Sequence, residues 1–226
     1  MTTYSINLGI TDYKEIYDLQ RSIALKKENG ELLDNFVFFL EHKSVFTLGK
    51  RGGKENLTVT DDFLEEKGVS VVHVERGGNI TYHGEGQIIV YPVIDLKQFG
   101  FSVKDYVSKL EDIMISTSRD FGVDINRNEL NRGTWVGNKK IGSVGIAVKK
   151  GIVFHGLSLN VRPDLTPFKW INPCGLEGVG ITSLEHELGV EINIDNAYDR
   201  IIENTKEIFE VNFKPMTKEN LLTKVM

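Results

Sequence analysis

The stretch KIGSVGIAVKKGIVFHGLSLNV, residues 140–161, decides the fold class. It contains two apolar runs, each long enough for a strand, on either side of Lys149-Lys150-Gly151. Two β-type runs joined by so short a turn are typical of a hairpin, in which neighbouring strands pair antiparallel. The sequence therefore predicts a β-sheet that contains this hairpin.

Other β-type runs precede the hairpin, and all of them are rich in β-branched and aromatic residues. They are NFVFFLEH (35–42), SVFTLG (44–49), VSVVHVER (69–76) and GQIIVYPVID (86–95). Strands that follow one another, with helices set apart from them, are typical of the α+β class. We therefore predict a mixed, mostly antiparallel β-sheet with helices packed on it.

Four segments have apolar residues at the spacing of an amphipathic helix. They are residues 12–28, 60–67, 103–121 and 197–210, and a short tail follows the last. Asp12, Thr60 and Ser102 can cap the first three, because their side chains can accept hydrogen bonds from the first turn. Thr182 and Glu185 have the spacing of a capping box and predict a further short helix.

Composition excludes several classes of protein. The chain has 226 residues, of which 40% are hydrophobic and 26% are charged, which predicts one globular domain spanning residues 1–226. A single cysteine excludes an intrachain disulfide, and the net charge of −5 argues against general nucleic-acid binding. No secretory signal or membrane-spanning run is evident, so we expect a cytoplasmic protein that does not bind membranes.

A glycine-rich loop is a candidate ligand-binding site, because glycine lets the backbone approach a ligand closely. The segment ERGGNITYHGEGQIIVYP, 75–92, carries four glycines between two predicted strands, with Arg76 and His83 near the ends of the loop. It is either a ligand-binding loop or a plain hairpin loop.

Lys140 begins an apolar strand, where a lysine either extends to the surface or acts as a general base. Ser143 stands where a phosphate loop needs lysine, so that motif is rejected.

His155 and Cys174 each have a structural and a chemical interpretation. His155 lies in an apolar run, which favours a hydrogen-bonded core histidine over a ligand. The histidines lack metal-ligand spacing and no carboxylates cluster near them, so we predict no metal. Cys174 lies in WINPCGLEG, 170–178, within a long loop, and is either a small buried hydrophobe or a nucleophile. A nucleophilic cysteine needs a nearby base or cation, and lysine can provide either.

Five short motifs occur together in one order. They are RGGNITYHGEGQ (76–87), KIGSVG (140–145), FHGLSLNV (154–161), NPCG (172–175) and TSL (182–184). Over about residues 30–190, this series resembles the lipoyl (octanoyl) transferase family, also called lipoate-protein ligase B. The resemblance implies the fold of the biotin and lipoate ligases, a class II synthetase-like domain with a mixed sheet and helices on one side.

The resemblance also implies an activity. The family transfers an octanoyl group from an acyl carrier protein to a lysine of lipoyl domains in 2-oxoacid dehydrogenases and of the glycine-cleavage H protein. It uses neither ATP nor a metal, and we expect a monomer. An ATP-dependent lipoate or biotin ligase, and a non-catalytic acyl-binding paralogue, are the alternatives.

The family's catalytic residues match Cys174, as the nucleophile, and Lys140, as its partner. The matched positions around the acyl group are Arg76, Gly77, Gly78, Asn79, Ile80, Thr81, Tyr82, His83, Ser143, Val144, Gly145, Gly156, Leu157 and Ser158, with His155 in support. Glu85 stands where the family usually has proline, which removes a backbone restraint from this loop but no catalytic atom.

Overall fold

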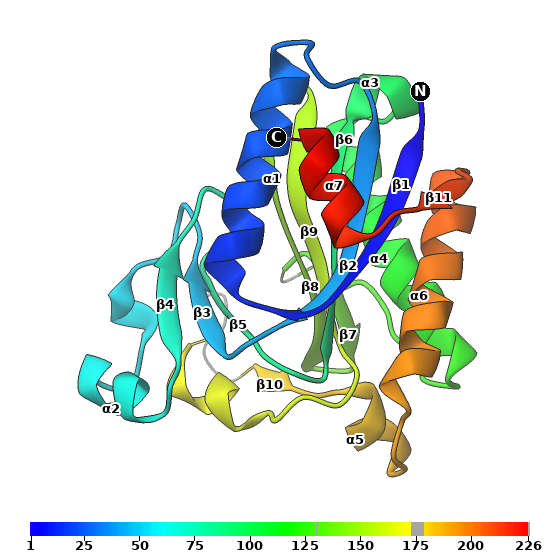
Figure 1. Ribbon diagram of the computed structural model, residues 1–226. Coiled ribbons are helices and arrows are strands. Elements are labelled where there is room, and N and C mark those ends of the chain that lie inside the picture. The colour runs from blue at the N-terminus through cyan, green and yellow to red at the C-terminus, as the bar shows by residue number, and fades with distance from the viewer. Residues whose placement is uncertain (130, 173–178, 226) are drawn as a thin grey trace.

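A large mixed β-sheet forms the centre of the computed structural model, which describes residues 1–129, 131–172 and 179–225 (Figure 1). Its strands are β1 (Thr3–Thr11), β2 (Asn35–His42), β6 (Gln87–Asp95), β7 (Thr134–Val136), β8 (Lys139–Lys149), β9 (Ile152–Asn160), β10 (Gly180–Ile181) and β11 (Phe213–Pro215). Their order is β10-β8-β9-β6-β2-β1-β11, with β7 paired to β8. The hairpin predicted from residues 140–161 is β8–β9, antiparallel, with Gly145 opposite Gly156.

A second sheet of three strands stands beside the first (Figure 1). It consists of β3 (Val45–Leu48), β4 (Ser70–His73) and β5 (Ile80–His83), in the order β4-β3-β5. Strand β5 lies within the segment that we predicted to be one glycine-rich loop, so that prediction is wrong in part. The local pattern hid β5 because four residues between glycine-rich turns are too few to display an alternation.

Helices cover both faces of the large sheet (Figure 1). Helices α1 (Tyr13–Glu28) and α7 (Lys218–Val225) pack with the β2 residues Phe36 and Phe38, whereas α4 (Val103–Asp120) and α6 (Ile194–Phe209) pack with Val37 and Phe39. Every residue of β2 is buried, so both faces of this strand need a cover. The expectation of helices on one side is therefore wrong, and the short tail that we expected contains β11 and α7.

Most of the predicted helix starts are confirmed. Asp12 accepts from the backbone N–H groups of Lys14 and Glu15, Thr60 caps α2 (Asp61–Glu66), and Ser102 forms a capping box at the start of α4. The box predicted at Thr182 is wrong, because Ser183 caps α5 (Leu184–Leu188) and the Thr182 hydroxyl donates to Glu187 instead. The remaining short helices are η1 (Lys54–Asn56), α3 (Leu96–Phe99) and η2 (Thr166–Trp170).

Three buried histidines and several tyrosines fill the junction between α1 and the two sheets. The ring centroids of Tyr13 and His42 lie 4.8 Å apart, those of His42 and His83 lie 5.9 Å apart, and those of Tyr17 and His155 lie 5.6 Å apart. Burial lowers the pKa of each of these histidines to about 3, and mutual repulsion adds to the effect. All three rings are therefore neutral at neutral pH.

This histidine cluster predicts a pH-dependent stability. Below the ordinary histidine pKa of 6.5, the unfolded chain binds protons that the folded chain excludes until about pH 3. Each of these histidines therefore lowers the free energy of unfolding by about 1.4 kcal/mol for each pH unit below the ordinary histidine pKa. Urea denaturation between about pH 7.5 and about pH 5.5 should show a steep loss of stability on acidification. The variant His42→Asn should lose stability less steeply, and a wild-type stability that stays flat over this range would contradict the cluster's neutrality.

Candidate active site

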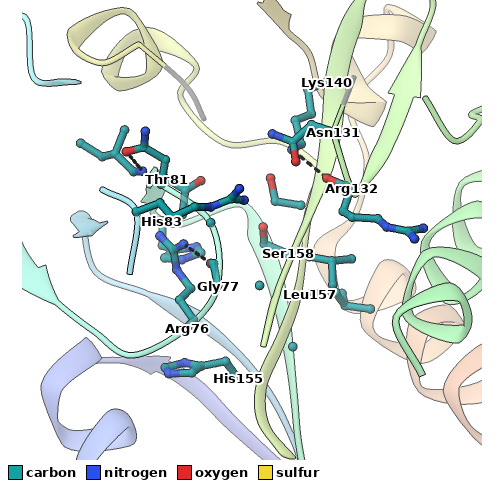
Figure 2. Close-up of a pocket in the computed structure, with 18 of the residues that line it drawn as sticks. Arg76, Gly77, Thr81, His83, Asn131, Arg132, Lys140, His155, Leu157 and Ser158 are labelled. Carbon is teal, nitrogen blue, oxygen red and sulfur yellow. Dashed lines mark hydrogen bonds between the residues drawn. The ribbon is translucent and has the colours of Figure 1, made fainter. Parts of the chain in front are cut away.

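A cavity of about 880 Å³ opens between the β8–β9 hairpin, strand β5 and two loops. Most of the site residues predicted from the sequence meet in its lining. They are Arg76, Gly77, Gly78, Asn79, Ile80, Thr81, His83, Lys140, Ser143, Val144, Gly145, His155, Gly156, Leu157 and Ser158. The lining therefore unites motif residues that lie up to 82 positions apart in the chain (158 minus 76), and Figure 2 shows how they surround the cavity.

The Arg76 side chain anchors the glycine-rich loop. It is only 7% exposed, and its guanidinium donates to the Thr47 carbonyl at 2.7 Å, to the Thr47 hydroxyl at 2.7 Å and to the Gly77 carbonyl at 2.9 Å. Thr47 belongs to β3, so these bonds tie the loop to the second sheet. Hydrogen bonds to a charged donor are about twice as strong as neutral ones, so the anchor holds the loop in one position.

Glycines let this loop lie directly on strand β8. The Gly77 N–H donates to the Ile146 carbonyl at 2.9 Å, so the loop backbone contacts the strand backbone. A Cβ atom on Gly145 would lie only 2.9 Å from Arg76 Cδ, closer than packed atoms allow. Gly145 is therefore required for the Arg76 loop to form a wall of the cavity.

Lys140 lies in the lining and is 4% exposed, which excludes the interpretation as a surface lysine. Its Nζ donates to the Arg132 carbonyl at 2.9 Å and lies 5.4 Å from the centroid of the Trp135 ring. A carbonyl oxygen accepts a hydrogen bond from either the charged or the neutral form of an amine. The amine is thus held in one place inside the cavity, where it can exchange protons with a bound substrate.

A buried carboxylate positions the loop that holds Lys140. Glu111, on α4, is 1% exposed, and it accepts from the Gly133 N–H at 3.0 Å and from Arg127 Nε at 2.9 Å. Arg132 Nη1 lies 3.6 Å from the same carboxylate. Because the Arg132 carbonyl accepts a hydrogen bond from Lys140, Glu111 fixes the position of the Lys140 amine through this loop.

His155 departs from the hydrogen-bonded core histidine that we predicted. Its ring is buried, but within the described part of the chain neither ring nitrogen has a hydrogen-bond partner. The backbone of His155 has a φ of 58°, a left-handed conformation that is rare for a residue inside a strand. Burial, together with the nearby positive charge of Arg76, keeps its pKa at about 3.

Some residues differ from the predicted set. Tyr82 is not in the lining but packs against Phe46 and Phe168, with ring centroids 5.4 Å and 5.3 Å away. Sequence reasoning missed several other lining residues. They are Arg51, Tyr91, Arg127, Asn128, Glu129, Asn131 and Arg132. A tyrosine before Pro92 in an apolar strand is a weak signal for Tyr91, whereas the loop of residues 127–132 has no motif of its own.

Cys174 lies outside the described residues, but the chain on both sides of it is anchored near the cavity. The Asn172 N–H donates to the Asn56 carbonyl at 2.9 Å, and the Asn56 amide donates to Asn79 in the lining. After residue 178, β10 pairs in parallel with Lys139 and Lys140. The described residues on either side of positions 173–178 are therefore connected to two parts of the lining, to Asn79 through Asn56 and to Lys140 through β10.

Two features are missing from the described residues. Among residues 1–129, 131–172 and 179–225, no three His, Cys, Asp or Glu side chains lie close enough together to hold a metal ion. No helix in these ranges combines the length and apolar composition needed to cross a membrane.

Comparisons with known proteins agree with this geometry. The family model of the lipoyl protein ligase A/B catalytic domain matches residues 12–206. The octanoyltransferase of Desulfotalea psychrophila is 42% identical over 209 residues, which are 92% of this chain and 94% of that protein. The octanoyltransferase of Caldanaerobacter subterraneus subsp. tengcongensis is 39% identical over 92% of this chain and 91% of that protein.

Solved structures share the fold at low sequence identity. A lipoate-protein ligase A bound with ATP aligns over 100% of this chain and 92% of its own length, with a TM-score of 0.78 and 18% identity. A putative lipoate protein ligase from T. acidophilum with bound lipoic acid covers 100% of this chain and 93% of its own length, with a TM-score of 0.77 and 17% identity. The resemblance seen in the sequence motifs is thus confirmed, and the chain belongs to the lipoyl protein ligase A/B catalytic domain family.

Proposed function

We propose that this protein is an octanoyltransferase that moves an octanoyl group from an acyl carrier protein to a lysine of a lipoyl domain. Cys174 is the nucleophile, Lys140 is the base, and the cavity holds the octanoyl chain. Residues 1–226 work as one domain, in the cytoplasm and as a monomer. The two octanoyltransferases that match almost the whole chain support the reaction.

One observation carries the catalytic assignment. Lys140 is buried in the cavity wall, and its strand β8 pairs with β10, which follows the NPCG segment after only a few residues. Asn172, two positions before Cys174 in the sequence, is hydrogen-bonded to Asn56, which contacts the lining residue Asn79. The contacts of the described residues on either side of Cys174 therefore support the proposal that this cysteine reacts in the cavity that contains Lys140.

The proposed reaction has two steps. Lys140 first takes the proton of the Cys174 thiol, and the thiolate attacks the thioester carbonyl of the donor. The bond from that carbonyl to the carrier's sulfur breaks, and the carrier thiolate takes the proton from Lys140. The acceptor lysine then attacks the octanoyl-Cys174 thioester, its proton passes through Lys140 to the leaving Cys174 sulfur, and an amide remains.

No energy source beyond the thioester is needed in this scheme. Exchange of one thioester for another is nearly neutral, and conversion of a thioester to an amide is favourable. The proposal therefore includes neither ATP nor a metal. The fold is shared with a ligase solved with ATP, so an ATP-dependent ligase is the second candidate. Release of pyrophosphate from ATP in the presence of free octanoate or lipoate would favour that candidate.

The acyl-enzyme is the first test. The purified protein, incubated with octanoyl-acyl carrier protein alone, should gain the mass of one octanoyl group on Cys174, and hydroxylamine should remove it because it cleaves thioesters. Cys174→Ala should gain nothing and should lose transfer to the lipoyl domain. Intact-mass spectrometry and peptide mapping report both results. Octanoyl transfer by Cys174→Ala at the wild-type rate would exclude this cysteine as the nucleophile.

Lys140→Ala should slow transfer by roughly 10²–10⁴-fold, the usual contribution of a general base. Its neighbour Lys139 provides the control, because Lys139 is partly exposed and paired with Glu187 rather than buried in the cavity wall. Lys139→Ala should keep nearly the wild-type kcat. Steady-state kinetics with circular dichroism of both variants make the comparison, and equal losses of rate in the two variants would eliminate the role of Lys140.

A further inference from the structure

His155 has features that the proposed reaction does not use. It lies in a strand interior with a left-handed backbone, and its backbone N–H donates to the Gln20 side chain at 2.8 Å. The pairing of β9 with β6 is interrupted here, between the pairs Val90–Leu157 and Ile94–Val153. Such a distortion persists only where the surroundings enforce it, and it is a recognised feature of ligand sites.

The distorted backbone changes the direction of the side chain. Consecutive side chains of a regular strand point to opposite faces, yet the Phe154 and His155 rings lie only 5.1 Å apart. The His155 ring instead stacks on Tyr17 of α1 and meets Tyr91 edge-on, with ring centroids 5.6 Å and 5.9 Å away. Since both His155 and Tyr91 line the cavity, these rings form one end of it.

This end is the one farthest from the reacting groups. In the β8–β9 register His155 lies opposite Ile146, six residues beyond Lys140 (146 minus 140), which is about 20 Å at the usual rise of a strand. Figure 2 shows Lys140 and His155 at opposite ends of the residues that surround the cavity. An extended chain of eight carbons spans about 10 Å, given single bonds of about 1.5 Å, so it fits within this distance together with the thioester.

The exposure of the lining side chains falls from the loop near Lys140 toward His155. The side chains of Arg127 and Arg132, in the loop near Lys140, are 42% and 55% exposed, whereas Tyr91 is 4% exposed and His155 is 1% exposed. The cavity is therefore open beside Lys140 and closed at the aromatic end. An acyl chain that reacts near Lys140 would extend toward His155 with its methyl end.

We infer that His155 closes the inner end of the acyl-binding cavity and sets the longest acyl chain that the enzyme accepts, an inference that rests on the proposed octanoyl transfer. A longer chain would have to displace a ring held between Tyr17 and Tyr91. It would also bring methylene groups against ring nitrogens that have no hydrogen-bond partner in the described residues, and a polar atom that faces only hydrocarbon is unfavourable.

The variant His155→Asn tests this inference. Asparagine accepts a left-handed backbone readily, so the strand geometry is kept while the ring is removed. The space should admit about two more methylene groups, and the ratio of kcat/KM for decanoyl to that for octanoyl carrier protein should rise about ten-fold. The assay follows transfer to a lipoyl domain with carriers loaded with eight, ten and twelve carbons, and His155→Gly provides a second variant that also accepts this φ.

His42→Asn is the matched control. His42 is equally buried and belongs to the same aromatic cluster, but it does not line the cavity. It should lower thermal stability and leave the decanoyl-to-octanoyl ratio unchanged. An unchanged ratio in folded His155→Asn or His155→Gly, or an equal rise in the control, would overturn the inference. Failure of the wild-type protein to transfer octanoyl at all would instead overturn the proposed function, and with it this inference.

Discussion

The site depends on the hydrogen bonds that the buried guanidinium of Arg76 donates. Burying a charge is unfavourable unless hydrogen bonds replace its water, and here Thr47 and the Gly77 carbonyl provide them. Because Thr47 lies in β3 and Gly77 contacts β8, this one side chain joins the second sheet to the large sheet. Burial lowers the pKa of His83 and His155, and the charge of Arg76 adds to this effect, so the aromatic end of the cavity is neutral.

Different kinds of interaction hold the two ends of the cavity in place. At the open end, the buried carboxylate of Glu111 fixes the loop whose Arg132 carbonyl holds the Lys140 amine. At the closed end, packing between aromatic rings and a strained strand hold His155. Hydrogen bonds thus orient Lys140, the proposed proton-transfer group, and packing shapes the end of the cavity proposed to receive the methyl end of the acyl chain. This division matches the chemistry of an acyl transfer, in which only the thioester end reacts.

Much of the fold is predictable from local pattern. The β8–β9 hairpin, strand β2 and the capped starts of α1, α2 and α4 follow from apolar runs and capping residues, which act over a few positions. Strand β1 was not predicted, because it is only partly buried and one of its partners is the three-residue β11 from the other end of the chain. Pairings between distant segments leave little trace in local periodicity. Helices on both faces of the sheet escaped prediction for the same reason.

The site was predictable as a list of residues but not as an arrangement. Motif order identified Arg76, Lys140 and most of the lining, whereas the burial of Lys140 depends on a loop held by Glu111, which carries no motif. The left-handed backbone of His155 has no signature in the run FHGLSLNV, because a glycine, the usual marker of that conformation, does not occupy the position. The sequence therefore indicated which residues meet, and the tertiary contacts determine what each one does.

In the proposed complex the acyl chain lies in this cavity, with its reactive end near Lys140 and its methyl end at His155. A donor carrier loaded with an octanoyl group that bears a photoreactive diazirine at its last carbon tests this placement. After acyl transfer to the enzyme and illumination, peptide mapping locates the cross-link. We expect labelling of the closed end, at Tyr91, His155 and their neighbours. Labelling confined to residues 127–129, 131 and 132, near Lys140, would exclude this orientation of the chain.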